Sequence, residues 1–184
     1  QYTLMSWFFE VRDRQSAKNG LIRVRREFGS WNVSVSNCGQ TSPYLNQMWD
    51  EAFKRLSVYA GNQRINSVLM LGLGAGGEIA KISREYPGSS LTVVEYDEAM
   101  IAIAKELKLY APAPFPNVVC EDAALAVPKL PGTYDLIIVD LFKGPTPSPL
   151  SEDPAFLKAL HEKLSDTGFM LVNVYHEEKI FAHI

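Results

Sequence analysis

The residues with the clearest chemical use in this sequence are glycines that follow the apolar segment Val68–Leu71. These glycines are Gly72, Gly74, Gly76 and Gly77, and at most one other residue lies between two successive glycines. Glycines at such a turn let the backbone bend sharply and approach a nucleotide closely. Glu95 directly follows the next apolar segment, Leu91–Val94, where an acid can accept hydrogen bonds from ribose hydroxyls. The pattern predicts a site for an adenosine-containing ligand.

Two further acids follow predicted strands later in the chain. Asp122, with Ala123 beside it, comes after Asn117–Cys120, and Asp140 comes directly after Leu136–Val139. An acid at one such place often only caps a helix. Ligands of open α/β sheets bind beyond the carboxyl ends of the strands, however. The glycine loop and three acids at successive strand ends therefore favour one shared binding site.

Strands alternate with helices after residue 66, which predicts an α/β fold with a mostly parallel, Rossmann-like sheet covered by helices on both faces. Uninterrupted apolar segments such as Leu136–Val139 fit strands that are buried on both faces. The expected strands are Val68–Leu71, Leu91–Glu95, Asn117–Cys120, Leu136–Val139 and Phe169–Val174. The expected helices are Gly77–Tyr86, Glu98–Leu109 and Pro154–Leu164.

The first 60 residues have a different pattern. Leu21–Arg26 and Trp31–Ser36 alternate as strands do, and the turn residues Phe28–Ser30 between them predict a small β-hairpin. Apolar residues at helical spacing predict a helix over Leu45–Tyr59 that packs on the sheet. We expect residues 1–60 to pack on a ligand-binding domain at 61–184. A helical start at His176–Ile184 that then stops suggests a fragment or a short chain that lacks the last strands of such a sheet.

Composition narrows the classes of function. A net charge of −3 provides no basic excess, so we expect no nucleic-acid partner. No apolar segment reaches membrane-spanning length, so we expect no membrane partner. Cys38 and Cys120 lie far apart without metal-ligand spacing, which is typical of reduced thiols in a cytoplasmic protein and predicts no metal site.

The glycine spacing fits two classes of cofactor. Gly72, Gly74 and Gly77 match the GxGxxG pattern of dinucleotide-binding proteins, whereas Gly72, Gly74 and Gly76 match the GxGxG pattern of methyltransferases. A dehydrogenase also needs a nicotinamide site and a hydride-transfer partner. The three histidines all come late in the chain and form no convincing set, which leaves an NAD-binding protein as the weaker alternative.

Several segments resemble the spermidine synthase-like branch of the class I S-adenosylmethionine-dependent methyltransferase superfamily. They are Leu69–Glu78, Val93–Asp97, Glu121–Ala123, Thr133–Gly144 and Pro154–Val174, together with the N-terminal hairpin and Gly39–Ser42. The resemblance extends from about Leu21 to Val174. It implies a transferase that uses S-adenosylmethionine or its decarboxylated form and a small-molecule acceptor, and it makes a homodimer plausible.

The resemblance also implies roles for the cofactor-binding residues. Gly72, Gly74 and Gly76 would line the amino-acid portion of the cofactor. Glu95 would hold the ribose hydroxyls, and Asp122 would accept a hydrogen bond from the adenine amino group. Ala123 follows in the same motif and is expected at the same site.

At the reacting end, Asp140 matches the acid that helps to deprotonate the attacking amine in polyamine synthases. Gln40 would face the tail of the cofactor, and Tyr44 the substrate pocket. We expect the segment Leu141–Ser151, rich in proline and glycine, to form a wall of the acceptor pocket.

Two departures from the polyamine synthase pattern remove negative charge. Those enzymes carry an Asp in the glycine loop, where this chain has Ala75, and a second Asp three residues after the catalytic one, where it has Lys143. A loop Asp would repel the carboxylate of intact S-adenosylmethionine. The departures therefore favour methyl transfer modestly over aminopropyl transfer. Aminopropyl transfer and a non-catalytic adenosine-binding module remain the alternatives.

Overall fold

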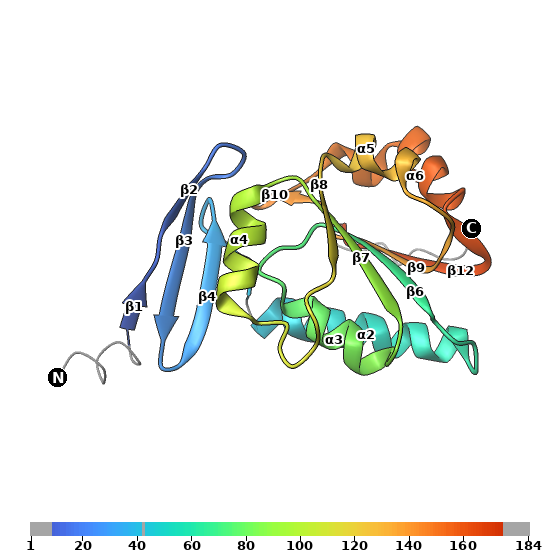
Figure 1. Ribbon diagram of the computed structural model, residues 1–184, viewed down its shortest axis with the longest axis horizontal. Coiled ribbons are helices and arrows are strands. Elements are labelled where there is room, and N and C mark those ends of the chain that lie inside the picture. The colour runs from blue at the N-terminus through green and yellow to red at the C-terminus, as the bar shows by residue number, and fades with distance from the viewer. Residues whose placement is uncertain (1–8, 42, 175–184) are drawn as a thin grey trace.

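The computed structural model describes residues 9–41 and 43–174, and its centre is a parallel sheet of five strands. The strands lie in the order β12-β9-β6-β7-β8, and every neighbouring pair is parallel (Figure 1). Their bounds are β6 (Ser67–Leu71), β7 (Ser90–Glu95), β8 (Asn117–Cys120), β9 (Tyr134–Val139) and β12 (Leu164–Val172). The predicted α/β class with a parallel sheet is confirmed.

Helices cover both faces of this sheet. One face is covered by α2 (Pro43–Ala60), α3 (Gly77–Glu85) and α4 (Glu98–Leu107), and the other by α5 (Ala123–Ala126) and α6 (Pro154–His161) (Figure 1). Successive strand residues point to opposite faces, so Met70 packs with the first group and Leu71 with the second. The expected packing of the long N-terminal helix is confirmed, because Trp49 and Phe53 of α2 are buried against the sheet.

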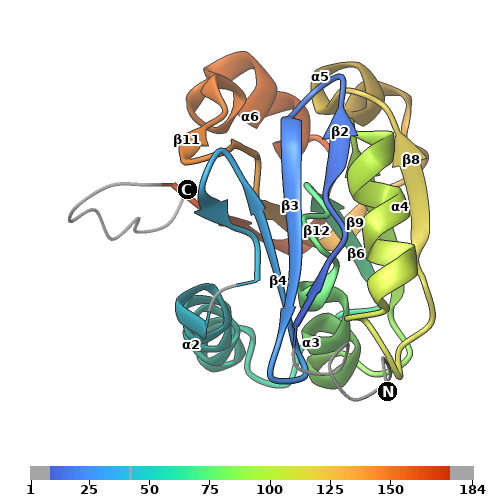
Figure 2. The same cartoon turned by 90° about the vertical axis from the view of Figure 1, so that its left-hand side faces the viewer.

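The residues before α2 form an antiparallel sheet that is larger than the predicted hairpin. Its strands are β1 (Phe9–Val11), β2 (Arg14–Ser16), β3 (Gly20–Glu27), β4 (Ser30–Val35) and β5 (Cys38–Gly39). The predicted hairpin is β3 with β4, and its turn contains Phe28 and Gly29, both at positive φ. Strands β1 and β2 both pair with β3 (Figure 2). Three residues each are too few for an alternation pattern to reveal them.

The antiparallel sheet is held against α4 by an apolar cluster. The inward side chains of β3 and β4, among them Ile22 and Val33, pack on Met100, Ile103 and Leu107 of the helix. Helix α4 therefore lies between the two sheets (Figures 1 and 2).

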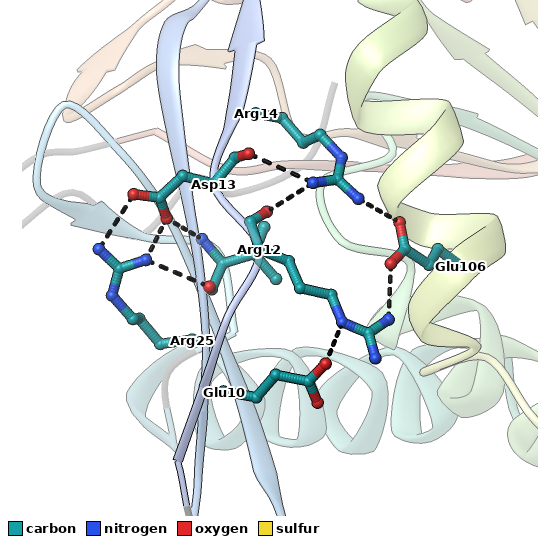
Figure 3. A network of polar contacts seen from close by, with 7 residues as sticks. Glu10, Arg12, Asp13, Arg14, Arg25 and Glu106 are labelled. Carbon is teal, nitrogen blue, oxygen red and sulfur yellow. Dashed lines mark hydrogen bonds and ion pairs between the residues drawn. The ribbon is translucent and has the colours of Figure 1, made fainter. Parts of the chain in front are cut away.

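Ion pairs at the edge of this contact join the strands to the same helix. Arg12 pairs with Glu10 and Glu106, each at 2.6 Å, and Arg14 reaches Glu106 at 3.0 Å (Figure 3). Because Arg12 and Arg14 donate hydrogen bonds to it, the pKa of the Glu106 carboxyl is lowered.

The segment after β9 is more ordered than the predicted loop. It forms a short hairpin of β10 (Phe142–Lys143) and β11 (Thr146–Pro147), followed by a 3-10 turn over Pro149–Glu152. The three helices predicted after residue 66 all end earlier than expected, α3 by one residue, at Glu85. Helix α4 stops at Leu107 because Lys108 adopts a left-handed conformation, and α6 stops at His161 because Leu164 already begins β12. The predicted helical start at 176–184 lies outside the described residues.

Candidate functional site

A cavity of about 1050 Å³ lies at the carboxyl ends of the parallel strands. Its floor is the loop after β6, and its walls come from the ends of β7 and β9, the start of α2, and the β10–β11 hairpin. The end of the antiparallel sheet closes one side with Val35, Cys38 and Gln40. Its volume is near the upper end of the range for pockets that bind small molecules.

The glycine loop leaves β6 and enters the cavity at Gly72 and Gly74. Gly72 has a φ of +93°, and its N–H donates to the Val94 carbonyl at 2.8 Å. A Cβ atom at this position would lie 2.1 Å from the backbone oxygen of Asp140. Only glycine fits here, and its absent side chain lets β6 and β9 meet directly below the cavity.

The next two loop residues face away from the cavity. Gly76 has a φ of +85°, and a Cβ there would lie 3.3 Å from the Cβ of Ala104 in α4. Ala75 is fully buried in the apolar cluster between α4 and the antiparallel sheet. Of the three glycines expected at the cofactor, Gly72 and Gly74 line the cavity and Gly76 serves the packing of α4.

Glu95 is anchored at the end of β7 by backbone donors. One carboxylate oxygen accepts from the Leu73 N–H and the other from the Asp97 N–H, both at 2.9 Å. Burial raises the pKa of this carboxyl, whereas these N–H donors favour its charged form and lower it. The side chain is 6% exposed and borders the cavity. Each oxygen has a second lone pair for a ligand hydroxyl.

Asp122 and Ala123 line the cavity beyond β8. Asp122 caps α5, because its side chain accepts from the Ala124 N–H at 2.9 Å. Sequence reasoning placed both residues at the site without predicting α5, which is only four residues long. The cap orients the carboxylate of Asp122, which is solvent-exposed at the cavity rim.

Asp140 stands at the end of β9, where its N–H donates to the Leu71 carbonyl at 2.8 Å. Its Oδ1 accepts from Nδ2 of Asn173 at 2.8 Å. Burial raises the pKa of Asp140, and hydrogen bonds from Asn173 and the Trp49 indole lower it. The Asp140 carboxylate borders the cavity and is held in one orientation by Asn173, just after β12, and by Trp49 of α2.

The remaining predicted residues form the walls. Gln40 follows β5, and its Oε1 lies 3.7 Å from where a Cβ on Gly74 would be. Tyr44, at the start of α2, is 74% exposed, and Lys143, in β10, is also exposed. All three border the cavity. Lys143 therefore lies at the open side of the site and not buried beside Asp140.

Sequence reasoning missed several polar residues of the cavity, among them Glu78 and Asn173; Asn19, Tyr96 and Glu121 also border it. Glu78 directly follows the glycine motif, but an acid in the first turn of a helix is ordinary and carries no signal by itself. Asn173 was assigned to a buried strand, whereas it follows β12 and reaches Asp140 across the sheet edge.

The cavity has a strongly acidic lining. Among the described residues that border it, Lys143 is the one cation and five are acidic: Glu78, Glu95, Glu121, Asp122 and Asp140. Such a lining attracts a cationic ligand. Within the described ranges, no group of three or more His, Cys, Asp or Glu side chains is arranged to hold a metal ion. No helix in those ranges is both long and apolar enough to cross a bilayer.

Comparison with known proteins identifies relatives of one kind. The chain is 27% identical over 125 residues to a polyamine aminopropyltransferase of Vibrio vulnificus (strain CMCP6), a match that covers 66% of this chain and 42% of that protein. It is 29% identical over 147 residues to a probable polyamine aminopropyl transferase of Bifidobacterium longum (strain NCC 2705), covering 80% and 31%. A polyamine aminopropyltransferase of Clostridium botulinum (strain Eklund 17B / Type B) is 30% identical over 131 residues, covering 67% and 44%.

The chain spans less than half the length of these relatives. No protein-family model matches it. The sequence relatives are named as aminopropyltransferases, the class that the sequence analysis kept as an alternative to methyl transfer.

Solved structures share the fold. Spermidine synthase from Thermotoga maritima superposes with a TM-score of 0.70 at 21% identity, covering 88% of this chain and 56% of that one. A spermidine synthase in complex with the transition-state analogue AdoDATO has a TM-score of 0.67 at 18% identity, covering 88% and 55%. The parallel sheet preceded by an antiparallel sheet is thus the spermidine synthase arrangement.

Proposed function

We propose that this chain, a spermidine synthase-like member of the class I S-adenosylmethionine-binding fold, transfers an aminopropyl group from decarboxylated S-adenosylmethionine to a small amine. The observation that carries the proposal is the convergence of the glycine loop, Glu95, Asp122 and Asp140 on one cavity. The aminopropyltransferase relatives support the same chemistry.

The residues of the cavity fit an adenosine-containing sulfonium. The loop at Gly72 and Gly74 leaves room for close backbone approach, Glu95 offers two anchored acceptor oxygens for ribose hydroxyls, and Asp122 offers an acceptor for an amino group. Bound there, such a sulfonium would supply an activated carbon and a thioether leaving group.

The charge of the cavity supports the decarboxylated form of the cofactor. Five acidic residues and one lysine border the cavity; Glu121 pairs with Lys129, which is not among the lining residues, and Lys143 is exposed at the rim, so the lining keeps a negative excess. The carboxylate of intact S-adenosylmethionine would add a negative charge to this group. Two unit charges about 4 Å apart interact by roughly 4 kcal/mol at an effective dielectric near 20. Ala75 does not favour the intact form, because its side chain packs away from the cavity.

Asp140 is the residue we assign as the general base. Its carboxylate is held by Asn173 and Trp49 and borders the cavity beyond the glycine loop. An aliphatic amine is an ammonium ion near pH 7, so it must lose one proton before its nitrogen lone pair can attack. Asp140 takes that proton, the new nitrogen–carbon bond forms as the carbon–sulfur bond of the sulfonium breaks, and methylthioadenosine leaves as the thioether. The surrounding acids orient the amine. Such positioned proton transfer contributes about 100-fold to 10,000-fold to a rate.

The variant Asp140→Asn tests this assignment. We expect turnover with decarboxylated S-adenosylmethionine and a diamine or polyamine to fall by about 100-fold or more, because an amide cannot accept the proton. Binding of 5′-methylthioadenosine, measured by calorimetry, should stay within a factor of about three. Asp166→Asn, an exposed acid in β12, is the matched control and should leave both unchanged. Unaltered turnover in Asp140→Asn would overturn the assignment of Asp140 as the base, whereas a wild type that binds methylthioadenosine and shows no turnover would indicate a non-catalytic binding module.

Methyl transfer is the second candidate, and the lysine at position 143 favours it. Parallel calorimetric titrations with intact and decarboxylated S-adenosylmethionine decide between the two. We expect at least tenfold tighter binding of the decarboxylated form, since its tail carries no carboxylate. Tighter binding of the intact form would restore methyl transfer. A chain that binds neither would contradict the proposed function as a whole.

A further inference from the structure

Glu78 is a buried acid that the mechanism above leaves without a role. It lies in the first turn of α3, directly after the glycine loop, and borders the same cavity as Asp140 and Gln40. Glu78 is only 8% exposed. Within residues 9–41 and 43–174, the one hydrogen-bond partner of its carboxylate is its own backbone N–H.

Two charged side chains act on Glu78. Lys81 lies one turn along α3, but its Nζ donates to the Asn46 carbonyl at 3.0 Å and to the Asp50 carboxylate in α2. Asp140 faces it from the end of β9 with a like charge. Burial and Asp140 raise the pKa of Glu78 to about 7, while its own N–H and Lys81 lower it.

A buried carboxyl without a cationic partner is costly in its charged form. An ammonium group entering the cavity would supply the missing cation and face Asp140 and Gln40 as well. The tail of decarboxylated S-adenosylmethionine ends in such a group. Ala75, three residues earlier, is turned into the apolar cluster and offers nothing to it.

We propose that Glu78 is the specificity-determining residue that binds the ammonium group of the cofactor tail, and that binding this group expels one proton from the site. This inference rests on the proposed function, because it assumes an adenosine ligand with a cationic tail. The step balances: neutral Glu78 loses its proton to the buffer, the carboxylate remains, and the ammonium enters with its protons unchanged.

The proton release depends on pH in a defined direction. With a pKa of about 7, the empty site holds the Glu78 proton mostly at pH 6 and mostly lacks it at pH 8. A bound ammonium favours the charged carboxylate and lowers that pKa. Affinity for the cationic ligand should therefore rise as pH increases through 7, with close to one proton released at pH 6 and little at pH 8.

The test is calorimetry of the wild type, Glu78→Gln and the control Glu85→Gln, an exposed acid on the same helix. The ligands are decarboxylated S-adenosylmethionine and 5′-methylthioadenosine, which lacks the ammonium tail. Titrations at pH 6 and pH 8, in two buffers of different ionisation enthalpy, count the protons. We expect Glu78→Gln to bind the cationic ligand roughly tenfold to hundredfold more weakly and to release almost no proton at pH 6. Methylthioadenosine should bind all three proteins alike.

The outcomes separate this inference from the proposed function. If all three proteins bind methylthioadenosine and Glu78→Gln matches the wild type with the cationic ligand, the role of Glu78 is overturned and the adenosine site stands. If the wild type binds neither ligand, the proposed function fails and the inference with it. The number of protons that the wild type releases on binding can be measured without any variant. If the wild type releases no proton on binding the cationic ligand at pH 6, the inference is overturned even where Glu78→Gln does not fold.

Discussion

Two buried glutamates on either side of the glycine loop show how hydrogen bonding assigns different roles to one residue type. Glu95 accepts two backbone N–H donors, which fix its carboxylate in the structure. Glu78 has no backbone donor other than its own N–H among the described residues, so its charge is open to control by a ligand. The first carboxylate suits neutral hydroxyls, and the second suits a cation.

At the residue scale, Gly72→Ala should abolish adenosine binding and destabilise the fold severely. The new Cβ would lie 2.1 Å from the Asp140 carbonyl oxygen, so β6 and β9 must separate. Gly88→Ala is the matched control, because Gly88 has a similar φ of +84° with nothing within 4 Å of a Cβ. We expect it to cost about 1 kcal/mol from backbone strain alone. Equal melting temperatures for the two variants would contradict the steric argument.

At the scale of elements, Asp135 joins the amino ends of three strands, opposite the cavity. Its Oδ2 accepts from the backbone N–H groups of Asn66 and Ser67, at 2.9 and 3.1 Å, just before and at the start of β6. Its Oδ1 accepts from Ser165 Oγ in β12 at 3.0 Å. One side chain of β9 thus helps to set the register of both neighbouring strands.

Asp135→Asn should lower the free energy of unfolding by about 0.5 to 1.5 kcal/mol at pH 7, because partly buried and exposed donors lose a charged acceptor. Although burial raises the pKa of Asp135, these hydrogen bonds lower it below its ordinary value. The ionised Asp135 therefore contributes its full share to the free energy of unfolding above the unfolded-state pKa, which is near 4. This contribution is lost as the pH falls through the lower folded-state pKa. Denaturant unfolding at pH 7 and pH 3 measures this. A difference between wild type and variant that persists undiminished at pH 3 would contradict it.

At the scale of the whole molecule, α4 belongs to both layers. Ile101 and Ala104 pack toward the parallel sheet, whereas Met100, Ile103 and Leu107 pack toward the antiparallel sheet. Because Gln40 and Val35 of the antiparallel side border the cavity, this contact also closes one side of the cavity.

Apolar packing and not the ion pairs should dominate this contact. We expect Ile103→Ala, at a residue that is 2% exposed, to destabilise the protein by about 2 to 4 kcal/mol. Glu106→Gln breaks the pairs with Arg12 and Arg14 at a side chain that is 35% exposed, so solvent screening limits its cost to at most about 1 kcal/mol. Denaturant unfolding in low and high salt distinguishes the two variants. The loss of stability in Glu106→Gln should shrink as salt increases, whereas the loss in Ile103→Ala should not.

Local patterns determined the class of fold and most of the site. The strands of the parallel sheet are buried on both faces and so read as apolar runs, and the glycines and acids at their ends follow them directly in sequence. Placing Gly72, Glu95, Asp122 and Asp140 together needed only the rule that parallel strands end at one edge. Short elements such as β1, β2 and α5 have too few residues to show a period, and they were missed.

Only the tertiary structure decided which side chains border the cavity and how their charges combine. Ala75 and Glu78 lie three residues apart, yet one packs on α4 and the other borders the cavity. Asn173 meets Asp140 because β12 and β9 are neighbours, although 33 residues separate them in sequence. The negative charge of the cavity comes from acidic residues that lie at several strand ends and loops. Burial and long-range proximity set such properties, and a linear pattern does not record them.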